Sequence, residues 1–216
     1  MNGILNKPSF DPKELVSFLK ENMSLQKEYE FRVRHYTLEQ HTLLVMNEFE
    51  KYFAKIELPI DIGLFRLLLC LHDIGKPKAF REGDKNKQYQ NNKEIIYSLK
   101  DSLPFNDKEI TLCMLIVGSD ILGLYFQNQI SLKIAKKMLL DLSSEIELPI
   151  FDLLKLMTTY YQCDIGSYTK DAGGLSYLEH LFEYQDGLKL FDSDKERLKF
   201  SPKYEVLYTN LENSLK

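Results

Sequence analysis

Residues Leu64 to Pro77 read LFRLLLCLHDIGKP, and this stretch decides how the chain is interpreted. It begins with the most apolar run of the sequence, which is typical of a helix buried in a protein core. His72 and Asp73 follow that run, and Gly75 and Pro77 are expected to end the helix. A carboxylate on a core-facing element costs free energy unless it is paired. A cation would remove that cost for Asp73, and a neutral imidazole is a natural metal ligand beside it.

A His-Asp pair at a helix end more often caps the helix than binds a metal, but two further residues favour a metal site. His41 lies on the apolar face of a helix that a capping box at residues 37–40 is expected to begin, although a lone core histidine is more often simply hydrogen-bonded. Asp164 ends an amphipathic helix expected from about residue 148, where a bond to a nearby turn is the alternative. Two imidazoles and two carboxylates suit a divalent transition metal. We therefore predict one divalent ion (Mn, Fe, Co, Ni, Zn or Mg) bound by His41, His72, Asp73 and Asp164.

Helix signals recur along the rest of the chain and predict an all-α fold. Asp11-Pro12 and Ser201-Pro202 each pair a capping residue with proline at the first helical position. Amphipathic helices are also expected over residues 89–99, 106–117 and 131–142. The charged residues 78–87 are interpreted as an exposed loop. No alternating strand pattern stands out, and a hairpin near residues 189–200 is left open.

Composition restricts the classes of function. The chain has 216 residues, 44% hydrophobic and 28% charged, which is ordinary for a soluble globular protein. The net charge of -4 argues against an extended nucleic-acid surface, but it does not argue against a small phosphorylated substrate, because one bound cation can dominate the local field. Three scattered cysteines without a CxxC pair are expected to be buried, reduced thiols. The first residues do not resemble a signal peptide, and the apolar run contains Arg66 and is too short to span a bilayer, so we expect a cytoplasmic protein without a membrane partner.

The histidine motifs resemble those of a known family, the HD superfamily of metal-dependent phosphohydrolases. Its pattern is a histidine on one helix, a His-Asp pair on a later helix and an aspartate farther on, and His41, His72-Asp73 and Asp164 match it. The segments HYTLEQHTLLVM (35–46) and LHDIGKP (71–77) are similar to the HD domains of bacterial uridylyltransferases and tRNA nucleotidyltransferases. The resemblance covers residues 31–170. It implies a bundle of antiparallel helices around a metal, in a single HD-type domain over residues 1–216 with N- and C-terminal helical extensions.

The resemblance also implies an activity, the hydrolysis of a phosphomonoester or phosphodiester by attack of a metal-bound water, with a nucleotide as the expected substrate. This chain departs from the family in two ways. Relatives with two metals carry further histidines after the His-Asp pair, whereas the only other histidines here are His35 and His180, so one metal is expected. Single-metal relatives carry acidic residues just after the pair, where this chain has Lys76. The alternative is a non-catalytic, nucleotide- or metal-binding regulatory module with a degenerate site.

Three residues are candidates for catalytic roles. Asp73 or Asp120 could act as the base for the attacking water. Asp120 more often would be the N-cap of the segment that follows it. Lys76, one helical turn past His72, could reach a substrate phosphate, and an interaction with the helix C-terminal dipole is an equally good interpretation.

Other polar residues are candidates for substrate binding. Arg34 and His35 precede the first metal helix and could hold phosphate there, although a solvated surface charge is the commoner role for each. Gln90, Asn91 and Lys93 fall where some relatives place another histidine, so they could line the pocket through hydrogen bonds. The oligomeric state cannot be deduced from these patterns.

Overall fold

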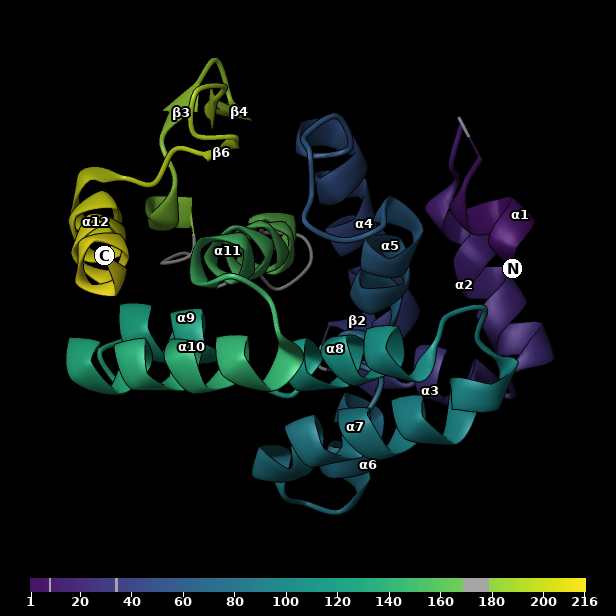
Figure 1. Ribbon diagram of the computed structural model, residues 1–216. Coiled ribbons are helices and arrows are strands. Elements are labelled where there is room, and N and C mark those ends of the chain that lie inside the picture. The colour runs from purple at the N-terminus through teal and green to yellow at the C-terminus, as the bar shows by residue number, and fades with distance from the viewer. Residues whose placement is uncertain (8, 34, 169–178) are drawn as a thin grey trace. The chain divides into compact units, whose positions relative to one another are not determined.

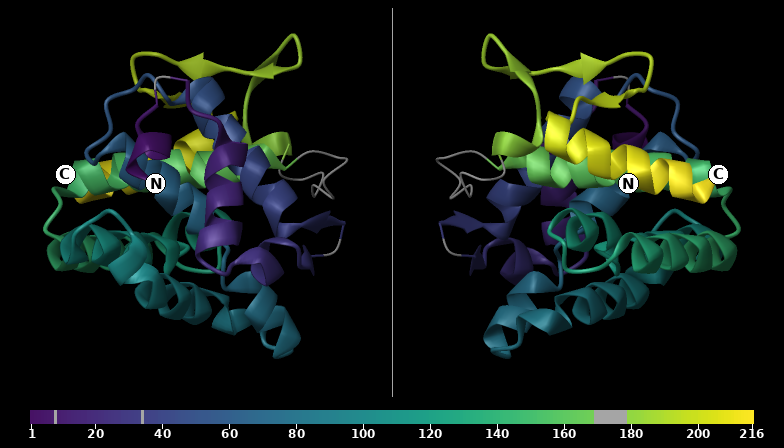
Figure 2. Two further views of the ribbon diagram at one scale, coloured as in Figure 1. Left: turned by 90° about the vertical axis from the view of Figure 1, so that its right-hand side faces the viewer. Right: turned by 90° about the vertical axis from the view of Figure 1, so that its left-hand side faces the viewer.

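The structure is a computed structural model that describes residues 1–7, 9–33, 35–168 and 179–216. It is mostly helical, with only short two-stranded pairs among the described residues, as Figures 1 and 2 show. The all-α prediction is therefore confirmed. The chain separates into two compact units. Within the described residues, the first unit contains residues 1–47 and 60–119 without residues 8 and 34, and the second contains 48–59, 120–168 and 179–216.

The first unit is built around helix α5, Ile62–Leu71. Its other elements are α1 (Asn2–Leu5), α2 (Pro12–Asn22), α3 (Gln26–Tyr29), β1 (Arg32–Val33), β2 (Tyr36–Thr37), the first part of α4 (Leu38–Tyr52), α6 (Lys76–Arg81), η1 (Lys85–Lys87), α7 (Gln88–Leu99), η2 (Lys100–Ser102) and α8 (Asp107–Val117). Strands β1 and β2 pair antiparallel. Helix α5 packs on α1 and α8, and α7 packs on α6 and α8.

Helix α5 is buried along its length, which agrees with its apolar sequence. Asp61 begins it by accepting hydrogen bonds from the backbone N–H groups of residues 63 and 64. The one charged side chain in the helix, Arg66, donates to the carbonyl of Leu5 at 2.7 Å and lies over the ring of Phe10. Close to the end of the helix, the Tyr29 hydroxyl donates to the Cys70 carbonyl at 2.9 Å. The buried polar groups of α5 therefore have partners, and the helix is a fixed support for the residues that follow it.

The second unit is a set of helices with two small hairpins. It contains the end of α4, α9 (Ile121–Phe126), α10 (Leu132–Ile146), α11 (Ile150–Ser167), η3 (Glu179–Leu181), β3 (Tyr184–Gln185), β4 (Leu188–Lys189), β5 (Phe191–Asp192), β6 (Arg197–Leu198) and α12 (Pro202–Leu215). Helix α10 packs on α9, α11 and α12. The amide of Gln162 bonds to both backbone groups of Leu198, which fixes strand β6 to α11. The hairpin of β5 and β6 lies in the region where the sequence left a hairpin open.

The loop expected over residues 78–87 is wrong for its first part, whereas residues 82–87 are mostly exposed as expected. Helix α6 spans Lys76–Arg81, and η1 follows it. Pro77 stands in the first turn of α6, where its missing N–H costs nothing, so it helps to begin a helix as well as to separate that helix from α5. The buried side chain of Ala79 gives this charged segment a core contact that the polar pattern obscured.

One segment is long and apolar enough to cross a membrane by length and composition. It is Asp107–Phe126, with a mean hydropathy of 1.6, and half of it is buried within the protein. The segment is not one continuous helix, because α8 ends at Val117 and α9 begins at Ile121. Core helices of soluble proteins have the same composition, so this segment is weak evidence for a membrane span.

Candidate metal centre

His41 and the His72-Asp73 pair come from adjacent parts of the first unit. The capping box at the start of α4 is present, since Thr37 and Gln40 exchange hydrogen bonds between side chain and backbone. It sets the beginning of the helix whose first turn carries His41. His72 is the C-cap of α5, and Asp73 lies in the turn before α6. All three side chains are buried.

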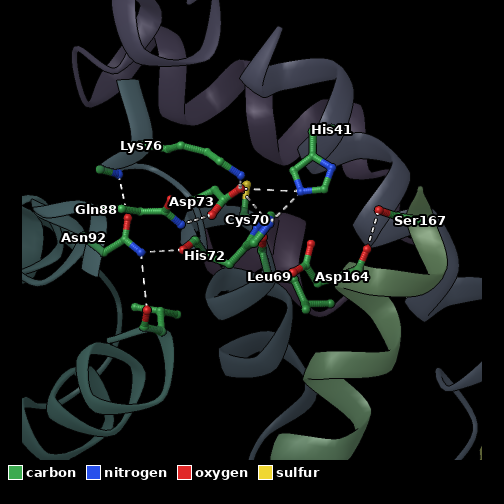
Figure 3. Close-up of polar contacts among 12 residues, drawn as sticks. His41, Leu69, Cys70, His72, Asp73, Lys76, Gln88, Asn92, Asp164 and Ser167 are labelled. Atoms are coloured by element: carbon green, nitrogen blue, oxygen red, sulfur yellow. Dashed lines mark hydrogen bonds and ion pairs between the residues drawn. The ribbon is translucent and has the colours of Figure 1, made fainter. Parts of the chain in front are cut away.

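The three side chains present their ligand atoms to one another (Figure 3). The Nε2 atoms of His41 and His72 are 3.2 Å apart, and Oδ2 of Asp73 lies 3.5 Å from the first and 3.7 Å from the second. A triangle with these sides has a point about 2 Å from each of its corners, and bonds from zinc to imidazole nitrogen or carboxylate oxygen are about 2.0–2.2 Å long. The spacing and the donor types therefore fit a divalent cation. These residues form the group that could hold a metal ion.

A backbone contact sets the protonation of His72. Its Nδ1 lies 2.7 Å from the carbonyl oxygen of Leu69. A carbonyl can only accept, so Nδ1 carries the hydrogen, and in the neutral ring Nε2 carries a lone pair. That lone pair faces His41 and Asp73. Metal-ligating histidines commonly have their other ring nitrogen held in this way.

The carboxylate of Asp73 is held from two further sides. The ammonium of Lys76 lies 2.6 Å from Oδ2, and the amide of Gln88 donates to Oδ1 at 2.7 Å. Burial by itself raises the pKa of the Asp73 carboxyl, but the Lys76 ammonium lowers it more, together with the imidazoles of His72 and His41 in their protonated form, so the pKa lies well below its ordinary value. The carboxylate is therefore ionised, as a metal ligand must be.

Asn92 holds the turn that carries the pair. Its Oδ1 accepts from the N–H of Gly75 at 2.6 Å, and its Nδ2 donates to the carbonyls of His72 and Val117 at 2.6 and 3.3 Å. The turn lies so close to α7 that a Cβ at Gly75 would overlap the backbone of residues 91 and 92. Helix α7 thus fixes both the backbone of the His-Asp turn, through Asn92, and the Asp73 carboxylate, through Gln88.

Gln88 and Asn92 were missed by sequence reasoning. The signal that could have found them is their spacing, because residues four apart share one face of a helix, and both are amides in the run QYQNN. A buried amide on an otherwise polar helix needs hydrogen-bond partners, and Asn92 is completely buried. The neighbouring His-Asp turn supplies those partners.

Asp164 and Asp120 belong to the second unit. Asp164 is in the last turn of α11, half-buried, and its carbonyl accepts from the Ser167 hydroxyl at 2.6 Å. Its role as a fourth ligand stays a prediction. Asp120 is the N-cap of α9 and accepts from the N–H of Gly123 at 3.1 Å, as the commoner interpretation had it. A catalytic role for Asp120 also stays a prediction.

His35, Gln90 and Lys93 are candidate phosphate ligands whose positions the structure describes. His35 lies in the turn between β1 and β2 with an exposed side chain, and Arg34 is outside the described residues. Gln90 is exposed and donates to Glu94 at 3.2 Å. Together with Lys93 it lines an apolar hollow between α7 and α8 that also involves Tyr97 and does not include Asp73. A substrate role for these residues is untested.

Comparisons with known proteins do not assign this site to a family. No protein-family model, curated protein or solved structure matches the chain. The helical architecture and the buried His-His-Asp group are compatible with an HD-like site. The HD family remains a resemblance carried by the two motifs at residues 35–46 and 71–77.

Proposed function

We propose that the chain is a metal-dependent phosphohydrolase that acts on a phosphomonoester or phosphodiester, with a nucleotide as the favoured substrate class. The observation that carries the proposal is the donor triangle of His41, His72 and Asp73, whose spacing fits one divalent cation. We include Asp164 as the fourth ligand because of the sequence pattern. Two imidazoles with carboxylates leave open positions on a metal for water and substrate.

Each residue of the site has a distinct part in the proposed reaction. The chemistry that a bound divalent cation supplies is the activation of water and the polarisation of a phosphoryl oxygen. His72 presents an unprotonated Nε2 because Leu69 holds its other nitrogen, and Asp73 supplies negative charge. Gln88 orients the Asp73 carboxylate through Oδ1. Lys76 supplies a positive charge at the edge of the site, where the phosphate of a substrate would need one.

Metal content and turnover, measured on the same samples, test this proposal. The purified chain should contain one divalent metal and hydrolyse bis(p-nitrophenyl) phosphate in the presence of manganese. His41→Ala should lose both properties. His180→Ala is the matched control, since His180 has an exposed side chain in the second unit. Equal turnover in His41→Ala and wild type would refute the proposal. If the expected difference is found, a panel of nucleotides would define the substrate.

A non-catalytic, metal- or nucleotide-binding regulatory module is the second candidate. The observation that favours it is the ammonium of Lys76 on Oδ2 of Asp73, because this ion pair neutralises the ligand charge without any metal. Such a module would bind metal or nucleotide and show no turnover with any divalent ion. The same samples therefore separate the two candidates.

A further inference from the structure

The two oxygens of the Asp73 carboxylate have different neighbours. Oδ1 accepts from the neutral amide of Gln88. Oδ2 faces the imidazoles of His41 and His72 and also contacts the ammonium of Lys76 at 2.6 Å. The oxygen that completes the donor triangle is thus the one that already has a cation against it.

A metal ion and the Lys76 ammonium cannot both approach Oδ2 without repulsion. A cation bound to Oδ2 at about 2 Å would lie within roughly 5 Å of Nζ if the lysine kept its position. Only 17% of the Lys76 side chain and 8% of the Asp73 side chain are exposed, so water screens this repulsion poorly. The two cations therefore compete for Oδ2, and a bound metal would weaken the ion pair of Lys76 with Asp73.

We infer that Lys76 is an internal counter-ion that competes with the divalent metal for Oδ2 of Asp73 and thereby sets the metal affinity of the site. The inference rests on the proposed metal centre. It adds a regulatory element to that centre, because the chain carries a charge that stabilises the metal-free state. Gln88 has the opposite effect, since it is neutral and holds the carboxylate by Oδ1 in the orientation that directs Oδ2 to the imidazoles.

Metal affinity of charge-removing variants tests the inference. Lys76→Met keeps most of the length of the side chain and removes the charge, so it should bind zinc or manganese at least about tenfold more tightly than wild type, by isothermal titration against a competing chelator. Gln88→Ala should bind about tenfold more weakly. Lys78→Met is the control, because Lys78 is also in α6, is exposed and pairs with Glu94 at 2.8 Å. It should bind as wild type does.

Thermal unfolding gives a second readout that a merely structural lysine would not produce. In chelator, Lys76→Met should melt below wild type, because Asp73 loses its counter-ion. With excess metal it should gain more in melting temperature than wild type gains. Lys76→Gln is a substitute if the methionine variant does not fold.

The outcomes separate the inference from the proposed function. Unchanged or weaker metal binding in Lys76→Met and Lys76→Gln, with normal binding in wild type, overturns the inference and leaves the metal centre intact. An equal gain in affinity for Lys78→Met overturns it too, because general charge would then be the cause. Absence of metal binding in wild type overturns the metal centre and the inference together.

Discussion

Asp73 is the residue on which the site depends, because its carboxylate contacts both imidazoles, an ammonium and an amide. Asp73→Ala removes the charged ligand while the apolar core of α5 remains. We expect the variant to lose its metal and all phosphohydrolase activity and to keep its helical circular dichroism. Asp101→Ala, at an exposed carboxylate in η2, is the control and should behave as wild type does. Equal activity of Asp73→Ala and wild type with metal added would rule out the catalytic role.

Asp164 can be tested as the fourth ligand by the same titration. If its carboxylate binds the metal, Asp164→Ala should weaken metal affinity at least tenfold, or about 1.4 kcal/mol. Asp152→Ala changes another carboxylate of α11 and should have no such effect. Wild-type affinity in Asp164→Ala would mean that the chain's other three ligands are sufficient.

Individual residues of the site were predictable to different degrees. His41, His72 and Asp73 could be grouped because each stands at the edge of an apolar helical face, and the structure brings these three together as a group that could hold a metal ion. The ion pair of Lys76 with Asp73 was not foreseen. The sequence suggested a lysine at the end of one helix, whereas the structure places it at the start of the next, where the turn directs it back to the carboxylate.

At the scale of elements, helix α7 supports the His-Asp turn through Asn92. Asn92→Ala leaves the N–H of Gly75 and the carbonyl of His72 buried without this partner, and each such loss costs about 1–3 kcal/mol. We expect the free energy of unfolding to fall by about 2–4 kcal/mol, measured by urea denaturation in chelator. Asn22→Ala is the control, because it removes one exposed bond to the Phe18 carbonyl and should cost a few tenths of that.

The junction of the β5–β6 hairpin with α12 predicts a dependence of stability on pH. Glu205 accepts from Arg197 at 2.6 Å and from Lys195 at 2.9 Å. Burial raises the pKa of the Glu205 carboxyl, but these two cations lower it more, so it lies below its ordinary value. A depressed carboxyl pKa stabilises the fold above the unfolded pKa of about 4.3, and the contribution is lost as pH falls through the folded pKa.

Urea denaturation between pH 3 and pH 7 checks this expectation. Wild type should lose stability more steeply below pH 4.3 than Glu205→Gln, which has no proton to gain. Glu21→Gln, at an exposed position of α2, is the control and should follow wild type. Parallel curves for wild type and Glu205→Gln would show that the pair with Arg197 does not stabilise the fold.

Several helix beginnings were predictable because caps are local. Asp11, Asp61, Asn106 and Ser131 each accept the backbone hydrogen bond expected of an N-cap. Helix α6 was not predictable in this way. Its six residues carry three basic side chains, and its first residue follows the glycine of the His-Asp turn. Packing against α7 and η1 stabilises this short and polar helix, and packing partners are not visible in local sequence.

At the scale of the whole molecule, the chain consists of two compact units, each with its own buried core. The candidate metal ligands of the first unit all lie in α4 or in the turn after α5. This local origin explains why motif spacing could find them. A single HD-type domain over residues 1–216 would require segments far apart in the sequence to assemble around one core. It stays a prediction.

The burial of Cys70 in α5 makes its thiol a reporter of local opening. Burial raises the pKa of the Cys70 thiol to about 12, which leaves almost no thiolate to react while α5 is closed. Labelling of Cys70 by a thiol reagent therefore reports how often the segment opens, two residues away from His72. Metal should slow that labelling. The rate at Cys163, which is buried in the second unit, shows on the same sample whether the metal protects one unit or the whole chain.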